Sequence, residues 1–120
     1  MKILVINGHP DQESYCQAIF QTIVETIDSN RHELQVINLN EEDFDPVLRY
    51  GYRKRMEEDS FILRSQEWIQ WADHLIFVYP IWWSSMPSLM KGWIDRVFTP
   101  GIAYSANDQG SFIWNFLRGK

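Results

Sequence analysis

The sequence predicts an α/β fold in which helices cover both faces of a parallel sheet. Two short apolar runs, residues 3–6 and 75–79, have the composition of strands that are buried on both faces. Segments with helical periodicity separate these runs, and such an alternation requires right-handed crossovers between parallel strands. The chain has 120 residues, the size of one ordinary domain, so we assign residues 1–120 to a single domain.

The first half of the chain predicts a strand, a helix and a second strand. The strand at residues 3–6 ends at Asn7-Gly8, and an amphipathic helix is expected over residues 14–29. A second strand is expected at residues 33–39, followed by an acidic loop that runs to Pro46. Residues 47–59 are ambiguous, and one interpretation is a helix interrupted by Gly51.

The second half predicts a helix over residues 60–72, the strand at 75–79, and a last helix that begins at Pro87 or Ser88. Pro80 ends the strand. The last helix presents apolar residues on one face, and Lys91, Asp95 and Arg96 are expected outside. The apolar residues are Leu89, Met90, Trp93, Ile94, Val97 and Phe98.

Charge and cysteine content exclude several classes of protein. A net charge of −5 argues against a general nucleic-acid binder. The basic run at residues 49–55 precedes three acidic residues at 57–59, so we interpret it as solvated surface. The single cysteine, Cys16, excludes an internal disulfide framework and a cysteine metal knuckle, and fits a reducing cytoplasm. The N-terminal apolar run is too short to cross a membrane, and we expect a soluble, cytoplasmic protein.

The loop after the first strand carries residues that could bind a phosphate. It lacks both the dinucleotide fingerprint and the P-loop pattern. It does offer a Gly turn, the potentially cationic His9, and Ser14 with the amides of Tyr15 and Cys16 at a helix N-terminus. The alternative interpretation is that Ser14 is only a helix cap and His9 only a loop residue.

The loop over residues 79–87 places two adjacent tryptophans, Trp82 and Trp83, on a turn. Its two prolines restrain the ends, so its amides could bind the polar edge of a ring system while an indole supports the ring face. Alternatively, the indoles fold back onto the core. Ligands of parallel α/β sheets bind beyond the carboxyl ends of the strands. We therefore expect residues 8–16 and 80–84 to lie side by side and form the principal pocket.

These segments resemble the NAD(P)H:quinone oxidoreductases of the DT-diaphorase type and their small bacterial relatives. The matching residues are HP at 9–10, SYC at 14–16, PIWWS at 80–84, PSLMKGWIDRVF at 87–98 and GIAY at 101–104. The resemblance implies a flavodoxin-like sheet, order 2-1-3-4-5 in the family, with the flavin at the switch point between strands one and three. It also implies that His9, Ser14, Tyr15 and Cys16 meet the flavin phosphates, that Pro80, Ile81, Trp82, Trp83 and Ser84 line the isoalloxazine ring, and that Tyr104 lies near the quinone.

The activity implied by the resemblance is that of an oxidoreductase with FAD or FMN as its cofactor. NADH or NADPH would deliver a hydride, and a quinone or similar acceptor would take two electrons in a ping-pong sequence that requires no acid or base from the protein. A homodimer is implied, with Trp93 and Phe98 as apolar anchors. Two rivals are a regulatory module of an ion-efflux system and an inactive truncated member. An azo- or nitro-compound reductase is an alternative within the enzyme class.

The sequence departs from the family pattern at two positions and at its C-terminal end. Cys16 stands where relatives often have Asn, and Ala106 where they often have a second tyrosine. Relatives also continue past residues 117–120 into a fourth strand, a Gly-rich loop and a fifth strand, so we expect this chain to be the N-terminal part of a longer domain. If the chain ends at Lys120, the strand at 75–79 becomes an edge, and the alternative expectation is that a neighbouring chain or residues 112–117 cover it. Flavin is then expected to be held poorly, because the Gly-rich loop that would close over the ring is missing.

Overall fold

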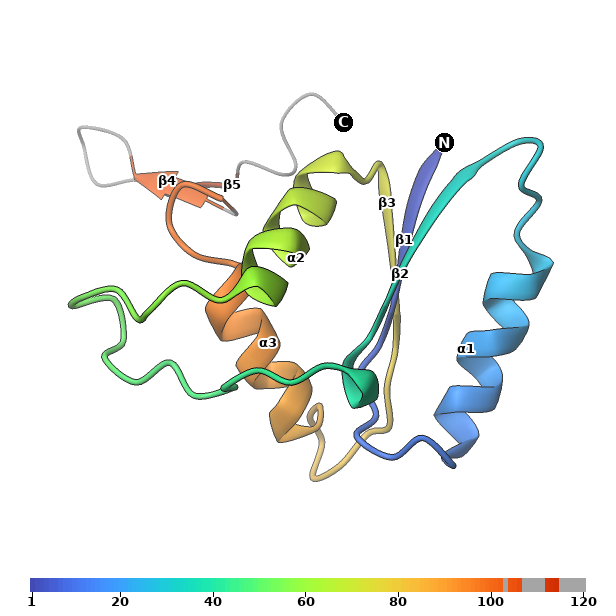
Figure 1. The fold of residues 1–120 in the computed structure, drawn as a ribbon, viewed down its shortest axis with the longest axis horizontal. Coiled ribbons are helices and arrows are strands. Elements are labelled where there is room, and N and C mark those ends of the chain that lie inside the picture. Colours follow the sequence, from blue (N-terminus) through green and yellow to red (C-terminus); the bar gives the residue numbers. More distant parts are fainter. Residues whose placement is uncertain (103, 107–111, 115–120) are drawn as a thin grey trace.

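The computed structural model describes residues 1–102, 104–106 and 112–114. Its centre is a parallel sheet of three strands in the order β2-β1-β3 (Figure 1), which confirms the predicted order of the first three strands. The strands are β1 (Lys2–Asn7), β2 (Glu33–Asn38) and β3 (His74–Val78). Helix α1 (Tyr15–Thr26) covers one face, and α2 (Ser60–Trp71) and α3 (Ser88–Val97) cover the other.

The register of the strands brings their carboxyl ends to one edge of the sheet. Asn7, at the end of β1, lies opposite Asn38 of β2 and Val78 of β3. Because β1 is the central strand, its side chains alternate between two buried faces. Any group placed after β1 therefore lies beside the groups that follow β2 and β3.

The two faces of the sheet carry two apolar clusters. Under α1, Ile3 and Val5 pack with Phe20. Under α2 and α3, Leu4 and Ile6 belong to a larger cluster that also contains the fully buried Trp93. The other buried members of this cluster are Ile37, Leu39, Phe61, Ile62, Ile69, Ala72, Met90 and Val97.

Side-chain caps define where two of the helices begin. Ser14 Oγ accepts a hydrogen bond from Gln17 N (3.1 Å) at the start of α1. Asp59 Oδ1 accepts from Phe61 N (2.9 Å) at the start of α2. Both helices begin within one residue of the predicted starts, and a short 3-10 helix, η1 (Leu39–Glu41), follows β2.

The connection between η1 and α2 corrects one interpretation of the sequence. Residues 47–59 form turns and no helix. Gly51 adopts φ +57° and its N–H donates to Leu48 O (3.2 Å), so this glycine closes a turn where a helix was one interpretation. Arg53, Lys54 and Arg55 are exposed, as the solvated interpretation of the basic run requires.

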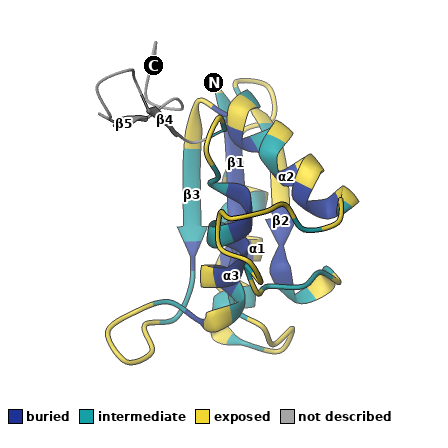
Figure 2. Cartoon of the chain, turned by 90° about the vertical axis from the view of Figure 1, so that its left-hand side faces the viewer, coloured by how far each residue is buried: buried dark blue, intermediate teal, exposed yellow. Residues whose placement is uncertain are grey.

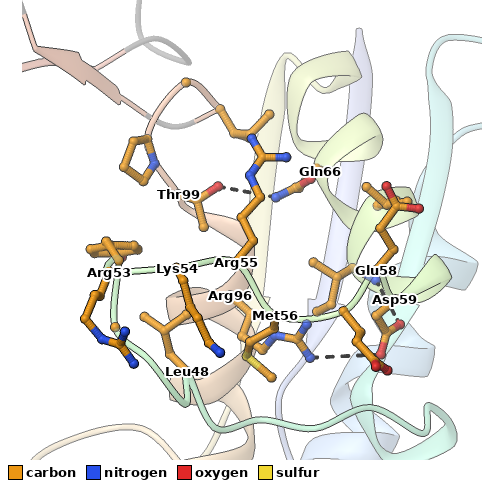
Figure 3. A pocket seen from close by; sticks show the side chains of 18 residues that line it. Leu48, Arg53, Lys54, Arg55, Met56, Glu58, Asp59, Gln66, Arg96 and Thr99 are labelled. Atoms are coloured by element: carbon orange, nitrogen blue, oxygen red, sulfur yellow. Dashed lines mark hydrogen bonds and ion pairs between the residues drawn. The ribbon is translucent and has the colours of Figure 1, made fainter.

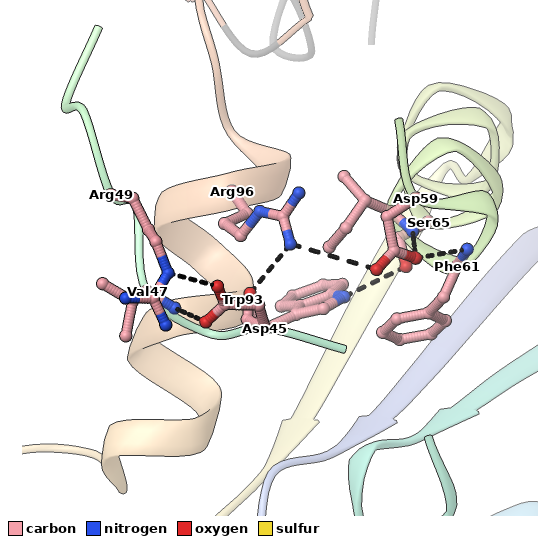
Figure 4. A network of polar contacts seen from close by, with 9 residues as sticks. Asp45, Val47, Arg49, Asp59, Phe61, Ser65, Trp93 and Arg96 are labelled. Carbon is pink, nitrogen blue, oxygen red and sulfur yellow. Dashed lines mark hydrogen bonds and ion pairs between the residues drawn. The ribbon is translucent and has the colours of Figure 1, made fainter. Parts of the chain in front are cut away.

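Two residues of α3 also differ from expectation. Arg96 was expected outside but is buried, because its Nη1 donates to Asp45 O (2.8 Å) and lies 4.0 Å from an Asp59 carboxylate oxygen. Trp93, expected as a dimer anchor, is fully buried in the single chain and donates from Nε1 to Ser65 Oγ (3.0 Å). Figure 4 shows the hydrogen bond from Trp93, which links α3 to α2, and the hydrogen bond from Arg96, which links α3 to the segment before α2.

An ion pair on the same connection fixes its first turn. Arg49 Nε donates to Asp45 Oδ2 (2.6 Å), and Val47 N donates to Asp45 Oδ1 (3.0 Å), as Figure 4 shows. The hydrogen bond from Arg49, followed by that from Val47, lowers the pKa of the Asp45 carboxyl. This turn leads the chain into Pro46, which packs against α3.

Strand β3 lies at one side of the sheet, next to β1 (Figure 2). Its residues 75–77 are half-buried, and within the described residues β3 is an edge strand, as predicted. Two further strands, β4 (Tyr104–Ala106) and β5 (Phe112–Trp114), form a separate antiparallel pair. Phe112–Trp114 therefore pairs with β4 and not with β3, and residues 115–117 lie outside the described part of the chain.

Replacing Gly92 with Ala should destabilise the fold by about 1–3 kcal/mol. A Cβ at this position would lie 2.8 Å from the carbonyl carbon of Pro46 and closer still to its oxygen, so α3 and the 45–59 connection would have to separate. Chemical denaturation of the variant measures the change in the free energy of unfolding.

The direction of the change in the free energy of unfolding decides whether Gly92 is required for this packing. Helix propensity alone predicts a gain of about 1 kcal/mol for Gly→Ala inside a helix. A more stable Gly92→Ala protein would contradict the packing described here. Gln70→Ala, at an exposed position of α2, is the control and should change stability by less than about 0.5 kcal/mol.

Candidate functional site

The loops that follow β1 and β3 meet at the carboxyl edge of the sheet. Gly8 N donates to Val78 O (2.8 Å), which continues the contact between the two strands into the loop. A Cβ on Gly8 would lie 3.0 Å from Met90 Cβ and closer to its sulfur, so a larger residue at this position would require Met90 to move. The rings of His9 and Trp82 meet edge to face at 5.2 Å and 78°. The expected proximity of residues 8–16 and 80–84 is therefore confirmed.

Short side-chain hydrogen bonds order the loop after β1. Asp11 N donates to His9 Nδ1 (2.9 Å), and Glu13 N donates to Asp11 Oδ1 (3.1 Å). An imidazole nitrogen that accepts a hydrogen bond carries no proton, so Nε2 is the nitrogen of His9 that remains able to donate.

The start of α1 supplies backbone donors beside His9. The first backbone hydrogen bond of the helix runs from Ala18 N to Ser14 O (3.4 Å), so the N–H groups of Tyr15 and Cys16 precede every intrahelical carbonyl partner. Ser14 Oγ is occupied as the cap. These donors and the positive end of the helix dipole favour a bound anion such as a phosphate.

The loop after β3 contains a tight turn with an unusual backbone. Trp82 N donates to Ser85 O (2.9 Å) and Ser85 N to Trp82 O (3.0 Å), so the turn has two central residues. Both of these, Trp83 (φ 51°) and Ser84 (φ 60°), adopt the left-handed conformation that glycine or asparagine normally supplies. This conformation costs about 1–2 kcal/mol for each such residue. Strain of this kind concentrates at ligand sites.

The turn holds apolar side chains away from the core. Trp83 is fully exposed at 101%, and Ile81 is exposed at 68%. Trp82 is 44% exposed and contacts His9, so neither indole folds back onto the core. Figure 2 shows the loop after β3 projecting as an exposed segment at the lower end of the molecule. An apolar surface beside anion-binding amides suits a flat ligand that carries a phosphate.

The structure brings most of the predicted site residues to this edge of the sheet. His9 and Trp82 are in contact, and Ser14, Tyr15 and Cys16 open the adjacent helix. The remaining residues of the second loop, Pro80, Ile81, Trp83 and Ser84, lie on or beside the turn. Tyr104 begins β4, and its side chain lies outside the described part of the chain, so its place near a quinone stays a prediction.

The sequence reasoning missed a cluster of carboxamides at the same edge. Asn7, Gln17, Asn38 and Asn40 are joined by side-chain hydrogen bonds beneath the first loop. Two of these asparagines end strands, and a polar side chain at the carboxyl end of a buried strand is a usable signal for such a cluster.

A cavity of about 690 Å³ lies elsewhere, between the 51–59 segment and the end of α3 (Figure 3). Arg53, Lys54 and Arg55 line one part of it, and Glu57, Glu58 and Asp59 line another, so the charges of its wall largely cancel. A pocket between the two loops stays a prediction. Among the described residues, none of the helices has the length and apolar character needed to cross a membrane.

Replacing Ser84 with Gly should stabilise the protein by about 1 kcal/mol, because glycine adopts the left-handed conformation without strain. Thermal or chemical unfolding measures this change. The matched control is Ser85→Gly, next along the chain and outside the left-handed region, where added backbone freedom should destabilise by about 0.5–1 kcal/mol. Equal destabilisation by both substitutions would contradict the turn geometry.

The chain resembles known proteins in sequence and in fold. A family model described as a flavodoxin-like fold matches residues 1–120. The ribosyldihydronicotinamide dehydrogenase-like protein traD of Penicillium crustosum is 30% identical over 139 aligned positions, which cover 100% of this chain and 52% of the relative. The ribosyldihydronicotinamide dehydrogenase [quinone] of Rattus norvegicus is 29% identical, with coverage of 99% and 59%. The chain thus spans little more than half the length of these curated relatives.

Comparison with solved structures gives the same family relationship. The crystal structure of Smu.1420 from Streptococcus mutans UA159 matches with a TM-score of 0.79 and 36% identity, covering 93% of this chain and 60% of that one. The NAD(P)H:quinone oxidoreductase from Methanothermobacter marburgensis matches with a TM-score of 0.73 and 28% identity, covering 88% and 57%. The resemblance drawn from the sequence is therefore confirmed, and the chain belongs to the flavodoxin-like fold family.

Proposed function

We propose that this chain holds a flavin and serves as an NAD(P)H:quinone oxidoreductase. The observation that carries the proposal is the meeting of two unlike surfaces at the carboxyl edge of the sheet. One is the group of anion-binding amides at the start of α1 beside His9, and the other is the exposed indole surface of the turn after β3. This edge, between strands one and three, is where flavodoxin-type sheets bind FMN.

Different residues of the site would contact different parts of the flavin nucleotide. His9 Nε2 and the N–H groups of Ser14, Tyr15 and Cys16 would hold phosphate oxygens. Trp82 and Trp83, with Pro80 and Ile81, would line the ring system, and Ser84 would contribute to its polar edge. His9 and Trp82 already touch, so the phosphate and ring parts of the site adjoin each other.

When bound, FMN or FAD would supply the redox chemistry, in which a hydride arrives from NADH or NADPH and two electrons leave to a quinone in a separate half-reaction. The protein's contribution is to bind, to orient the two substrates in turn and to exclude water from the ring face. Relatives with quinone dehydrogenase names support this assignment. The choice of Tyr104 as a quinone contact and the cytoplasmic location belong to the same proposal.

A homodimer is also part of the proposal, with α3 and the segment that leads to Tyr104 at the interface. Because Trp93 is fully buried within the chain, it cannot anchor a partner. Phe98, half-buried and edge-to-face with Trp93 at 5.9 Å, remains a candidate anchor. Sedimentation at micromolar concentration tests this part of the proposal.

A binding module is the second candidate function. The exposed side chains of Tyr15 (82%), Ile81 and Trp83 present apolar surface without a partner in the described part of the chain, and such surface also suits a protein partner. Flavin binding separates the two candidates. A chain that binds neither FMN nor FAD would favour the module.

Trp83→Ala should weaken flavin binding more than Trp71→Ala. Loss of an aromatic stacking partner costs about 1–3 kcal/mol, which corresponds to roughly 5- to 150-fold in Kd. Because Trp83 is fully exposed without ligand, its removal should leave the stability of the free protein nearly unchanged. Titration of FMN and FAD, followed by flavin fluorescence, measures both variants.

Trp71 is the control because it lies at the opposite end of the sheet. Its ring sits 5.9 Å from the ammonium of Lys2, the residue that begins β1. Trp71→Ala should lower the unfolding temperature and leave the flavin Kd unchanged. Equal flavin affinities in the two variants would count against the ring site.

A further inference from the structure

The side chain of Gln17 is the centre of a partly buried hydrogen-bond cluster. Its single carboxamide oxygen, Oε1, accepts from the Nδ2 groups of Asn7, Asn38 and Asn40, each at 3.0 Å. These donors come from the end of β1, the end of β2 and η1. One oxygen atom in the first turn of α1 thus ties the helix to the carboxyl edge of the sheet.

The cluster also forms hydrogen bonds to the backbone of the loop after β1. Asn7 is fully buried, donates a second bond to Asn38 Oδ1 (3.1 Å) and accepts with its own Oδ1 from His9 N (3.1 Å). Asn40 Nδ2 also contacts His9 O (3.4 Å). Both backbone groups of His9 are therefore held by asparagines that Gln17 holds in turn, and the position of the imidazole depends on the cluster.

The sequence around Gln17 would ordinarily predict a different arrangement. Ser14-x-x-Gln17 is a capping-box pattern, in which the glutamine side chain reaches back to the N–H of the capping serine. Here Ser14 Oγ makes its half of the box, with Gln17 N, but Gln17 Oε1 is committed to the three asparagines. In the described part of the chain, the Gln17 side chain therefore does not occupy the Ser14 N–H, which lies next to the N–H groups of Tyr15 and Cys16.

We propose that Gln17 is a positioning residue for phosphate recognition. By turning inward, its side chain fixes His9 and keeps three consecutive amides open to the phosphate group of a flavin nucleotide. This inference rests on the proposed function, because it names the residue that shapes the phosphate half of the same site. It makes a specific statement about ligands: the cluster should affect binding of FMN, which has a phosphate, and not of riboflavin, which has none.

The test compares Gln17→Met with Gln21→Met. Methionine keeps the length of the side chain but removes the acceptor, and Gln21 is an exposed position one turn later on the same helix. The wild-type chain should bind FMN more tightly than riboflavin. Gln17→Met should reduce this preference by about tenfold or more, the effect of losing a hydrogen bond to a charged group, with riboflavin affinity nearly unchanged. Gln21→Met should keep the wild-type preference.

The ratio of the two Kd values separates positioning from a general loss of structure. A destabilised protein would bind FMN and riboflavin less well in the same proportion, so an unchanged ratio in folded Gln17→Met would overturn the inference. If Gln17→Met fails to fold, Asn40→Ala decides, because it removes one donor and the contact with His9 O from a half-buried position. It should lower the FMN preference in the same direction, and retention of the full preference would overturn the inference.

The wild-type measurement distinguishes failure of the inference from failure of the proposed function. If the wild-type chain binds FMN and riboflavin with equal affinity, the assignment of the phosphate site is wrong. The proposed role of Gln17 is then wrong as well. If the wild-type chain prefers FMN and both variants keep that preference, the phosphate site stands and only the role of Gln17 is wrong.

Discussion

The parallel pairing of β1 with β3 is the constraint on which the rest of the site depends. The two strands are far apart in sequence, yet their register places Asn7 opposite Val78, and the hydrogen bond from Gly8 N to Val78 O carries the contact into the loop. Everything that follows either strand is therefore confined to one edge of the sheet. Glycine at position 8 lets Met90 of α3 pack directly against this edge, so the helix after the second loop is held by the first loop. The loops after β1 and β3 therefore lie side by side at this edge.

Much of this arrangement could be predicted from sequence, for physical reasons that are visible in particular residues. Residues 3–6 are apolar at every position because β1 faces two buried clusters, and that pattern is readable without a structure. The caps of α1 and α2 follow from Ser14 and Asp59, which bond to backbone within their own turn. Local rules also failed where a long-range contact decided the outcome. Arg96 is charged and was expected outside, but the carbonyl of Asp45, 51 positions away in sequence, satisfies it in the interior.

In the candidate site, too, some features could be predicted from the local sequence and others depend on long-range contacts. Residue types and loop positions pointed to His9, Ser14 and the two tryptophans, because a turn seldom carries adjacent indoles without a use for them. The left-handed backbone of Trp83 and Ser84 could not be read from the sequence, since neither residue favours that conformation and the tight turn imposes it. The inward orientation of Gln17 was equally hidden. Its sequence neighbourhood matches a capping box, and only the convergence of β1, β2 and η1 supplies the three donors that compete for its oxygen.

The central claim is that a single flavin nucleotide bridges the two loops, and amide NMR of the isotope-labelled chain with and without FMN tests it most directly. FMN should shift the backbone amide signals of Ser14, Tyr15 and Cys16 and, at the same ligand concentrations, the indole N–H signals of Trp82 and Trp83. Perturbation of only one loop would contradict it. So would shifts concentrated at residues 51–59, which line the separate cavity of about 690 Å³.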